Sequence, residues 1–349
     1  MKDLMRFNRF FSIQWHLTNK CDQKCKHCYI FNSDKPVDFN ELNINEISLV
    51  INSFIDFCEE FECNPSLTLI GGDPLLYPYF WEVLEYIHKH GIPFSILGNP
   101  FHLNHEVCLR LASLGCLDYQ MSLDGLENTH DQIRKPGSFS ATLSALDMIK
   151  EARLRTVIMS TVSRMNKDEI PKLIRLVTDL EVDVYGFARY CPTNGDTEYN
   201  MEPLEYREFL EKIWDVYSSL MDRKTIFSLK DHLFKLLLYE KGLYKINCED
   251  NLVMDGCNCG VRHMAILPNG DAYACRRFES PVGNVLKKDI KTIFLGPSMT
   301  TYRNFLNLEE CKDCELLRFC RGCHAVSYGT YGSFFSKDPQ CWKSTKRNT

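Results

Sequence analysis

Short apolar runs alternate with amphipathic stretches over residues 11–190 of the chain. The apolar runs are typical of buried strands. They cover residues 11–17, 66–70, 93–97, 117–123, 155–162 and 182–188. The stretches between them repeat apolar side chains with the helical period. They include residues 44–61, 79–90, 106–114 and 139–152. Gly91 and Gly115 follow two of these helices, where a left-handed helix end favours glycine.

Strands that alternate with helices in this way predict an α/β fold with a parallel sheet and right-handed crossovers. A (β/α) barrel and an open, doubly wound sheet give the same alternation, so the pattern alone does not distinguish them. In both architectures the functional groups lie on loops at the carboxyl ends of the strands.

The pattern changes after residue 190. Helices are predicted over residues 204–221 and 231–240, but from residue 247 onward both periodicities weaken while cysteine, glycine and polar turns become frequent. That composition is typical of a small domain organised by metal instead of a large apolar core. The predicted division is a barrel over residues 1–222, a helical bridge over 223–246 and a cysteine-rich domain over 247–349.

Composition narrows the classes of function. The net charge of −5 and the absence of a basic run argue against nucleic-acid binding. The N-terminus lacks a signal-peptide pattern, and no apolar stretch is long enough to span a bilayer, so a cytoplasmic protein without membrane contact is expected. Seventeen cysteines in a reducing compartment indicate metal rather than disulfides.

Three cysteines, Cys21, Cys25 and Cys28, lie within eight residues directly after the first predicted strand. Thiolates at this density indicate a metal, a disulfide or a reaction. Four cysteines usually hold a four-iron cluster, so three would leave one iron open to a small molecule. The alternative is a zinc site with a distant fourth ligand, for which His27 is poorly placed inside the loop. We call these three cysteines the N-terminal trio.

Small and polar residues follow the second predicted strand, at the same edge of the predicted sheet as the trio. The segment consists of Gly71, Gly72, Asp73 and Pro74. Two adjacent glycines at a strand end let the backbone pass close to a ligand. For this segment taken alone, an ordinary tight turn is the alternative.

Polar side chains also follow the third and fourth predicted strands. Asn99 ends the third, and Ser122 and Asp124 end the fourth. Hydroxyl and carboxylate groups suit the hydroxyls of a ribose, which need donors and acceptors, although Asn99 is also a common turn residue. Further on, Arg134 could bind a carboxylate in bidentate fashion or form a surface ion pair with Asp131.

The spacing Cys-x3-Cys-x2-Cys followed by Tyr29, together with these segments, resembles the radical S-adenosylmethionine (SAM) family. The resemblance implies a partial, six-stranded barrel whose open iron chelates the amino and carboxylate groups of SAM. Gly71 to Pro74 resemble that family's Gly-Gly-Glu-Pro motif, which accepts hydrogen bonds from the cofactor ammonium, with Asp73 as a shorter carboxylate. Ser122 and Asp124 match its Ser-x-Asp-Gly stretch. Arg134 matches the arginine that, in that family, suits the cofactor carboxylate.

Eight cysteines lie near the C-terminus, enough for two four-cysteine clusters. They are Cys257, Cys259, Cys275, Cys311, Cys314, Cys320, Cys323 and Cys341. Their order resembles the SPASM domain of radical SAM enzymes that modify peptides and proteins. A zinc ribbon is the alternative, but the five residues between the two Cys-x2-Cys doublets are fewer than zinc spacings have.

The resemblance implies two auxiliary clusters and therefore three [4Fe-4S] clusters in all. The outer set would be Cys311, Cys314, Cys320 and Cys341. The inner set would be Cys259, Cys275 and Cys323, completed by Cys257. The chain departs from the family in two ways: two residues instead of three separate Cys320 from Cys323, and the Cys-x-Cys pair is tight for one cluster. Cys248 is therefore an alternative to Cys257.

The function that the resemblance implies is reductive cleavage of SAM to a 5′-deoxyadenosyl radical, which removes hydrogen from a substrate. The expected activity is that of a maturase that installs a thioether or carbon–carbon crosslink in a ribosomally made peptide. A formylglycine-forming sulfatase maturase and a non-catalytic electron carrier are the alternatives. The expected partners are the peptide or protein substrate and an external reductant of flavodoxin or ferredoxin type.

One local contrast favours the crosslinker. Formylglycine formation needs a base beside the reacting carbon. Sulfatase-maturating enzymes resemble this chain here, but with an acidic residue after the cysteine that matches Cys275. This chain has Arg276 and Arg277 there, which cannot accept a proton near neutral pH and would suit an acidic peptide. The catalytic residues stay unknown, with Cys191, Asp271 and Tyr29 as the candidates.

Overall fold

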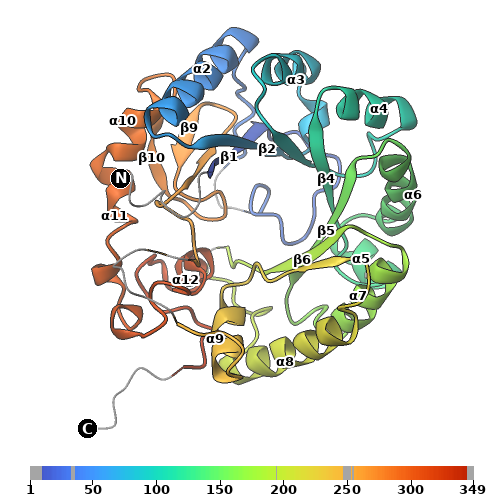
Figure 1. Ribbon diagram of the computed structural model, residues 1–349, viewed down its shortest axis with the longest axis vertical. Coiled ribbons are helices and arrows are strands. Elements are labelled where there is room, and N and C mark those ends of the chain that lie inside the picture. Colours follow the sequence, from blue (N-terminus) through green and yellow to red (C-terminus); the bar gives the residue numbers. More distant parts are fainter. Residues whose placement is uncertain (1–9, 33–35, 194, 247–252, 254, 344–349) are drawn as a thin grey trace. The chain divides into compact units, whose positions relative to one another are not determined.

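The computed structural model describes residues 10–32, 36–193, 195–246, 253 and 255–343 (Figure 1). The chain forms two compact units, each assembled from several segments. Unit 1 comprises Met1–Ser122, Asp131–Val157 and Asn258–Arg303. Unit 2 comprises Leu123–His130, Ile158–Cys257 and Asn304–Thr349. Residues 258–303 thus cluster with the N-terminal segments, while the predicted domain boundaries stay a prediction.

The six predicted strands are present and alternate with helices, which confirms the α/β fold class. They are β1 (Phe10–Thr18), β2 (Asn64–Gly71), β3 (Phe94–Leu97), β4 (Cys116–Ser122), β5 (Arg155–Val162) and β6 (Val184–Arg189). Most of their apolar side chains are buried, as in the covered strands of a parallel sheet, whereas Phe10 and Leu117 at the strand ends are about half exposed.

Unit 1 contains a mixed sheet with the order β10-β9-β8-β1-β2-β3-β4. The pairs from β8 through β1 to β4 are parallel. The remaining pairs are antiparallel and form a three-stranded meander of β8 (His263–Ile266), β9 (Asp271–Tyr273) and β10 (Pro281–Asn284). These three strands come from the region where no strand was predicted, because three or four residues are too few to show alternation.

Helices of unit 1 lie along one face of this sheet (Figure 1). They are α2 (Ile44–Glu60), α3 (Phe80–Lys89), α4 (His105–Ser113), α6 (Ser138–Glu151), α10 (Ile290–Leu295) and α11 (Pro297–Thr301). Gly91 and Gly115 adopt positive φ of 63° and 85° directly after α3 and α4, as predicted. A cluster of aromatic rings, Phe11, Phe57 and Phe294, joins β1, α2 and α10 in the core.

Unit 2 contains β6, its parallel partner β7 (Ile226–Ser228) and several helices. The helices are α7 (Ile170–Asp179), α8 (Pro203–Ser219), α9 (Leu233–Glu240) and α12 (His324–Tyr331). A further helix, α5 (Glu127–Ile133), and strand β5 have residues in both units. Phe187 packs against Phe209 and Phe234, which joins β6 to α8 and α9.

A buried ionic network fixes the C-terminal segment of unit 2. Arg189, the last residue of β6, donates to Asp231 at 2.7 Å and in bidentate fashion to Asp338, at 2.7 Å for each bond. Its side chain is 1% exposed. Asp338 also accepts the backbone N–H of Cys323 at 2.7 Å. The network therefore holds one predicted metal ligand against the end of a strand.

No helix in the described part of the chain is both long and apolar enough to cross a lipid bilayer.

Candidate cofactor and metal sites

The loop that carries the N-terminal trio is anchored by backbone hydrogen bonds at both ends. The N–H groups of Gly72 and Asp73 donate to the carbonyls of Thr18 and Lys20, both at 2.8 Å. Further along the loop, Lys26 N–H donates to the Ile133 carbonyl at 2.9 Å. The loop that follows β1 is thus held against the segment that follows β2.

Glycine is required where these two loops meet. A Cβ atom at Gly72 would lie 2.2 Å from the Lys20 carbonyl oxygen and 2.7 Å from Cys21 Cβ. At Gly98, a Cβ atom would lie 2.1 Å from the Tyr119 hydroxyl. The backbone at Gly72 thus passes close to the cysteine loop and holds it, while the predicted close passage to a ligand stays a prediction.

Asp73 presents an unused acceptor beside the trio. Its Oδ1 accepts the Leu75 N–H at 3.2 Å, whereas the buried Oδ2 has no hydrogen-bond partner among the described residues. Burial is the main cause that raises the pKa of the Asp73 carboxyl to about 7. A buried carboxylate without a donor is costly unless a ligand supplies one. The ammonium of SAM is such a donor, so this residue fits the predicted cofactor.

The described thiols of the trio do not converge as the ligands of a single metal ion do. Among the described residues, potential ligand atoms converge to within 4.8 Å of one another at Asp22, Asp73 and His102, and at no group of three thiols. A single zinc ion needs such convergence, whereas ligands around a four-iron cube lie further apart. Burial, the largest cause, and the neighbouring Asp73 and Cys28 raise the pKa of Cys21, so a bound cation would favour its thiolate.

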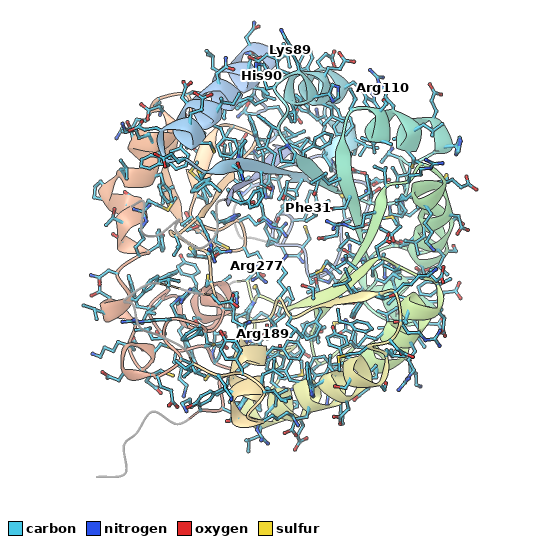
Figure 2. All side chains as sticks on the ribbon, in the orientation of Figure 1. Phe31, Lys89, His90, Arg110, Arg189 and Arg277 are labelled. Carbon is cyan, nitrogen blue, oxygen red and sulfur yellow. The ribbon has the colours of Figure 1, made fainter. Side chains whose placement is uncertain are left out.

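The trio has room for a ligand. A cavity of about 800 Å³ borders Cys21, within the size range of small-molecule sites. Its lining combines the apolar Phe31, Phe39 and Leu76 with Lys20 and others. Figure 2 shows Phe31 on the inner side of the unit 1 strands, opposite Lys89, His90 and Arg110 on the helical side.

Arg134 lies at the trio. Its Nη1 is 3.7 Å from Cys25 Sγ. The Asp131 carboxylate accepts the backbone N–H groups of Gly137 and Phe139, at 2.6 and 2.8 Å. The predicted cofactor contact of Arg134 is therefore compatible with its position, and its role stays a prediction.

Asn99 is engaged by the protein. Its side-chain amide donates to Asp22 at 2.9 Å and accepts the Phe101 N–H at 3.1 Å. The Asp22 carboxylate also faces His102 and Lys135, each at 3.5 Å. Asn99 thus orients an acidic side chain next to Cys21, a role that the sequence did not indicate.

Ser122 and Asp124 fall on either side of the division between the units, Ser122 in unit 1 and Asp124 in unit 2. The Asp124 carboxylate is fully buried and accepts the Thr161 N–H at 2.7 Å. Its backbone N–H donates to His130 Nδ1 at 3.1 Å. Asp124 therefore organises the start of unit 2, and the predicted ribose contact would have to use its remaining acceptor capacity.

Tyr29 belongs to a partly buried polar group that the sequence analysis missed. Arg276 donates to the Tyr29 hydroxyl at 2.9 Å, and His16 Nε2 is 3.4 Å from the same oxygen. Burial, with a smaller contribution from Arg276, lowers the pKa of His16 to about 3, so this imidazole is neutral. A histidine within an otherwise apolar strand was the available signal. Arg276 is thus used inside unit 1, and Figure 2 shows Arg277 on the inner side of the strands.

The other two catalytic candidates are held by protein groups. Cys191 is buried, and its thiol lies 3.8 Å from the Arg189 carbonyl oxygen. Both carboxylate oxygens of Asp271 accept side-chain amides, from Asn269 at 3.0 Å and from Asn284 at 2.9 Å. Asp271 therefore stabilises the antiparallel meander of β8, β9 and β10.

The outer cysteine set is brought together within unit 2. Burial, followed by the neighbouring thiols of Cys341 and Cys314, raises the pKa of Cys311 to about 12. Cys320 is buried beside Cys341 and Cys311 in the same way. Burial also raises the pKa of Cys341, and desolvated thiols that lie close together are stable only with protons or with bound cations. Their chemistry therefore fits an iron–sulfur cluster.

The inner cysteine set is divided between the units. Cys259 and Cys275 belong to unit 1, and Cys257 and Cys323 to unit 2. Within unit 2, Arg321 binds the Cys257 carbonyl at 2.8 Å. Arg321 adopts a φ of 99°, which is unusual for a residue with a side chain, in the shortened segment between Cys320 and Cys323. Cys248 lies outside the described residues.

Comparison with known protein families identifies two domains in the chain. The model of the radical SAM superfamily matches residues 15–177, and the model of the iron–sulfur cluster-binding SPASM domain matches residues 257–324. The chain is therefore a radical SAM enzyme of the SPASM type.

Two curated relatives cover almost the whole chain. The AdoMet-dependent heme synthase of Methanosarcina barkeri (strain Fusaro / DSM 804) is 26% identical over 345 residues, which is 94% of this chain and 95% of the relative. The mycofactocin maturase MftC of Mycobacterium ulcerans (strain Agy99) is 27% identical over 349 residues, 94% of this chain and 87% of the relative.

Solved structures share the fold. Streptococcus suis SuiB bound to S-adenosylmethionine has a TM-score of 0.74 at 18% identity, covering 97% of this chain and 80% of SuiB. SuiB bound to its precursor peptide SuiA has a TM-score of 0.74 at 17% identity, covering 97% and 78%. At these identities the likeness establishes the fold alone.

Proposed function

We propose that this enzyme is a peptide maturase that installs a thioether or carbon–carbon crosslink in a ribosomally made peptide. The observation that carries the proposal is the pairing of two kinds of thiol site in one chain. The N-terminal trio lies beside an unused, buried acceptor on Asp73, and eight further cysteines follow near the C-terminus. The relative MftC and the SuiB complex with a precursor peptide support the peptide as substrate class.

The residues of unit 1 have distinct tasks in this proposal. The N-terminal trio would hold a cluster with one open iron, and Asp73 Oδ2 would accept from the ammonium of SAM. Arg134, next to Cys25, would bind the cofactor carboxylate. Gly71, Gly72 and Pro74 keep the two loops in contact, and Asn99, Ser122 and Asp124 would serve the ribose side. When bound, the cluster and SAM supply a radical that removes a hydrogen atom from substrate.

Crosslink formation removes two hydrogens from the peptide in total. One leaves as an atom, and the other must leave as a proton and an electron. The eight C-terminal thiols would hold two auxiliary clusters, which supply an acceptor for that electron. An external protein of flavodoxin or ferredoxin type would reduce the first cluster.

Formation of heme is a second candidate function, favoured by one specific observation. The Methanosarcina relative named heme synthase matches this chain over nearly its whole length. In that case the substrate would be an iron porphyrin instead of a peptide. The two substrates differ so strongly in absorbance and mass that one assay separates them.

The formylglycine-forming alternative is weakened by the surroundings of Cys275. Arg276 follows it and is bonded to Tyr29, while Asp271 already accepts two side-chain amides. Neither is placed as a free base. Formation of an aldehyde in a sulfatase-motif peptide would nevertheless be the direct sign of that activity.

The experiment uses the anaerobically reconstituted, chemically reduced enzyme with SAM. It is incubated in parallel with a short peptide encoded beside it, a sulfatase-motif peptide and iron coproporphyrin. The proposal expects 5′-deoxyadenosine and an oxidised, crosslinked peptide in the first mixture. Efficient product formation from either of the other two substrates, with the neighbouring peptide unchanged, would refute it.

A further inference from the structure

The first residue of α12, His324, has a side chain whose hydrogen-bonding state can be assigned. The ring is buried, 2% exposed, and stacks on Phe334 with ring centroids 4.0 Å apart. Its Nδ1 lies 3.0 Å from the Phe334 carbonyl oxygen. A carbonyl oxygen only accepts, so Nδ1 carries the hydrogen and donates it. The neutral ring therefore has its lone pair on Nε2.

That Nε2 atom has no partner. It is buried and has no hydrogen bond to any described residue. An unsatisfied polar atom in the interior costs about 1–3 kcal/mol, so such atoms are usually explained by a ligand or water. A histidine that donates one ring N–H to a backbone carbonyl and presents its other nitrogen bare is oriented as metal-binding histidines are.

The surroundings of the ring belong to the inner cysteine set. His324 directly follows Cys323, and the thiols of Cys257 and Cys323 are near enough to act on it electrostatically. Arg321 holds the Cys257 segment in place through the Asp255 and Cys257 carbonyls, at 2.9 and 2.8 Å. All of these residues lie in unit 2.

A second histidine has a different role. His232, which precedes α9, forms a hydrogen bond with the Cys257 thiol. His232 is thus a donor to a thiol, which a cluster-bound thiolate can also accept, whereas Cys257 and Cys259 form a tight Cys-x-Cys pair for one cluster. His324 is the buried side chain beside Cys323 that has an unused lone pair.

We propose that His324 Nε2 is an iron ligand of the cluster to which Cys323 also binds. A hydrogen bond from His324 to a cluster sulfide is not an equivalent explanation, because the ring hydrogen is committed to Phe334. Imidazole in place of thiolate raises the reduction potential of an iron–sulfur cluster. The ligand would make this cluster a better electron acceptor, as the removal of an electron from substrate requires.

This inference depends on the iron–sulfur assignment of the C-terminal cysteines and not on which substrate the enzyme modifies. Its test therefore uses spectroscopy without substrate. The full chain, with the N-terminal trio changed to alanine to remove the first cluster, is reconstituted anaerobically and reduced. Electron spin echo spectra are compared for protein made with natural and with ¹⁵N-labelled histidine.

We expect a strongly coupled nitrogen that shifts with the isotope and disappears in His324→Leu. His232→Leu is the matched control, and it should keep the coupling. If His324→Leu does not fold, His324→Cys provides the decisive comparison. The nitrogen coupling should vanish there, the iron content should be kept, and the reduction potential of the cluster should fall.

Other results overturn the inference. A coupling that persists in His324→Cys, that is lost in His232→Leu instead, or that is absent from the parent protein while both auxiliary clusters are present would each exclude His324 as a ligand. A peptide left unmodified in the activity assay would count against the proposed function alone, because it leaves the nitrogen coupling untouched.

Discussion

Replacing Asp73 with asparagine should abolish the pH dependence of SAM binding. In the free enzyme, burial raises the pKa of this carboxyl to about 7. A bound cofactor amino group that donates an N–H to Asp73 favours the ionised carboxylate, so the cofactor competes with a proton for Asp73. The affinity of the parent enzyme must therefore fall as the pH falls through 7.

The size of this effect follows from the pKa. With a pKa of about 7, the ionised fraction changes about eightfold between about pH 6 and about pH 7.5. Asparagine cannot ionise, so Asp73→Asn should bind with one affinity at both pH values. At about pH 7.5 Asp73→Asn should bind SAM about 10- to 150-fold more weakly than the parent. This factor corresponds to the loss of one hydrogen bond to a charged group.

Equilibrium dialysis or calorimetry with anaerobically reconstituted enzyme measures both quantities. Asp118→Asn is a matched control, because this carboxylate is also buried in unit 1 but is paired with Arg155 at 2.8 Å. It should retain the full pH dependence. The reasoning is refuted if Asp73→Asn shows the same eightfold change as the parent, or if the parent shows none.

Three further predictions concern the metal and cofactor sites and the buried network. The parent should carry about twelve irons. Alanine at all three positions of the N-terminal trio should remove about four of them and end 5′-deoxyadenosine formation. Stoichiometric zinc in protein purified without air would contradict this prediction. Arg134→Ala should weaken SAM binding at unchanged iron content, and an unchanged affinity would leave Arg134 a surface residue. Arg189→Met should lower the free energy of unfolding by about 3–5 kcal/mol, because Asp231 and Asp338 stay buried and unpaired. The exposed Arg164→Met, measured by the same denaturant titration, should destabilise the protein far less, because its ion pairs are solvated; similar values for both variants would contradict the network.

The part of the fold that the sequence predicted is the part with local signals. The apolar run that became β5 was predicted with its observed bounds, Arg155–Val162, and the others to within a few residues. Strand β9, Asp271–Tyr273, was missed because three residues cannot display a period. The helix α12 was missed because its buried face is formed by small and polar residues such as Ala325 and Ser327.

Motifs marked the cysteines and Asp73 as candidates, but they did not indicate the contacts that depend on tertiary structure. Tyr29 and Arg276 are 247 positions apart, and Arg189 and Asp338 are 149 apart. No pattern of spacing links such pairs. The unused acceptor on Asp73 likewise becomes visible only when its burial and its partners are known. Sequence therefore located the chemistry, and structure was needed to show which groups the protein leaves available to a ligand.

The most direct test of the proposed function is the mass of a peptide. The reduced, reconstituted enzyme is incubated with SAM and the short peptide encoded beside it, and the peptide is analysed by tandem mass spectrometry. The account predicts a product lighter by one pair of hydrogen atoms, with a crosslink between two residues and 5′-deoxyadenosine formed alongside. An unchanged peptide, together with SAM-dependent conversion of iron coproporphyrin to heme under the same conditions, would contradict it.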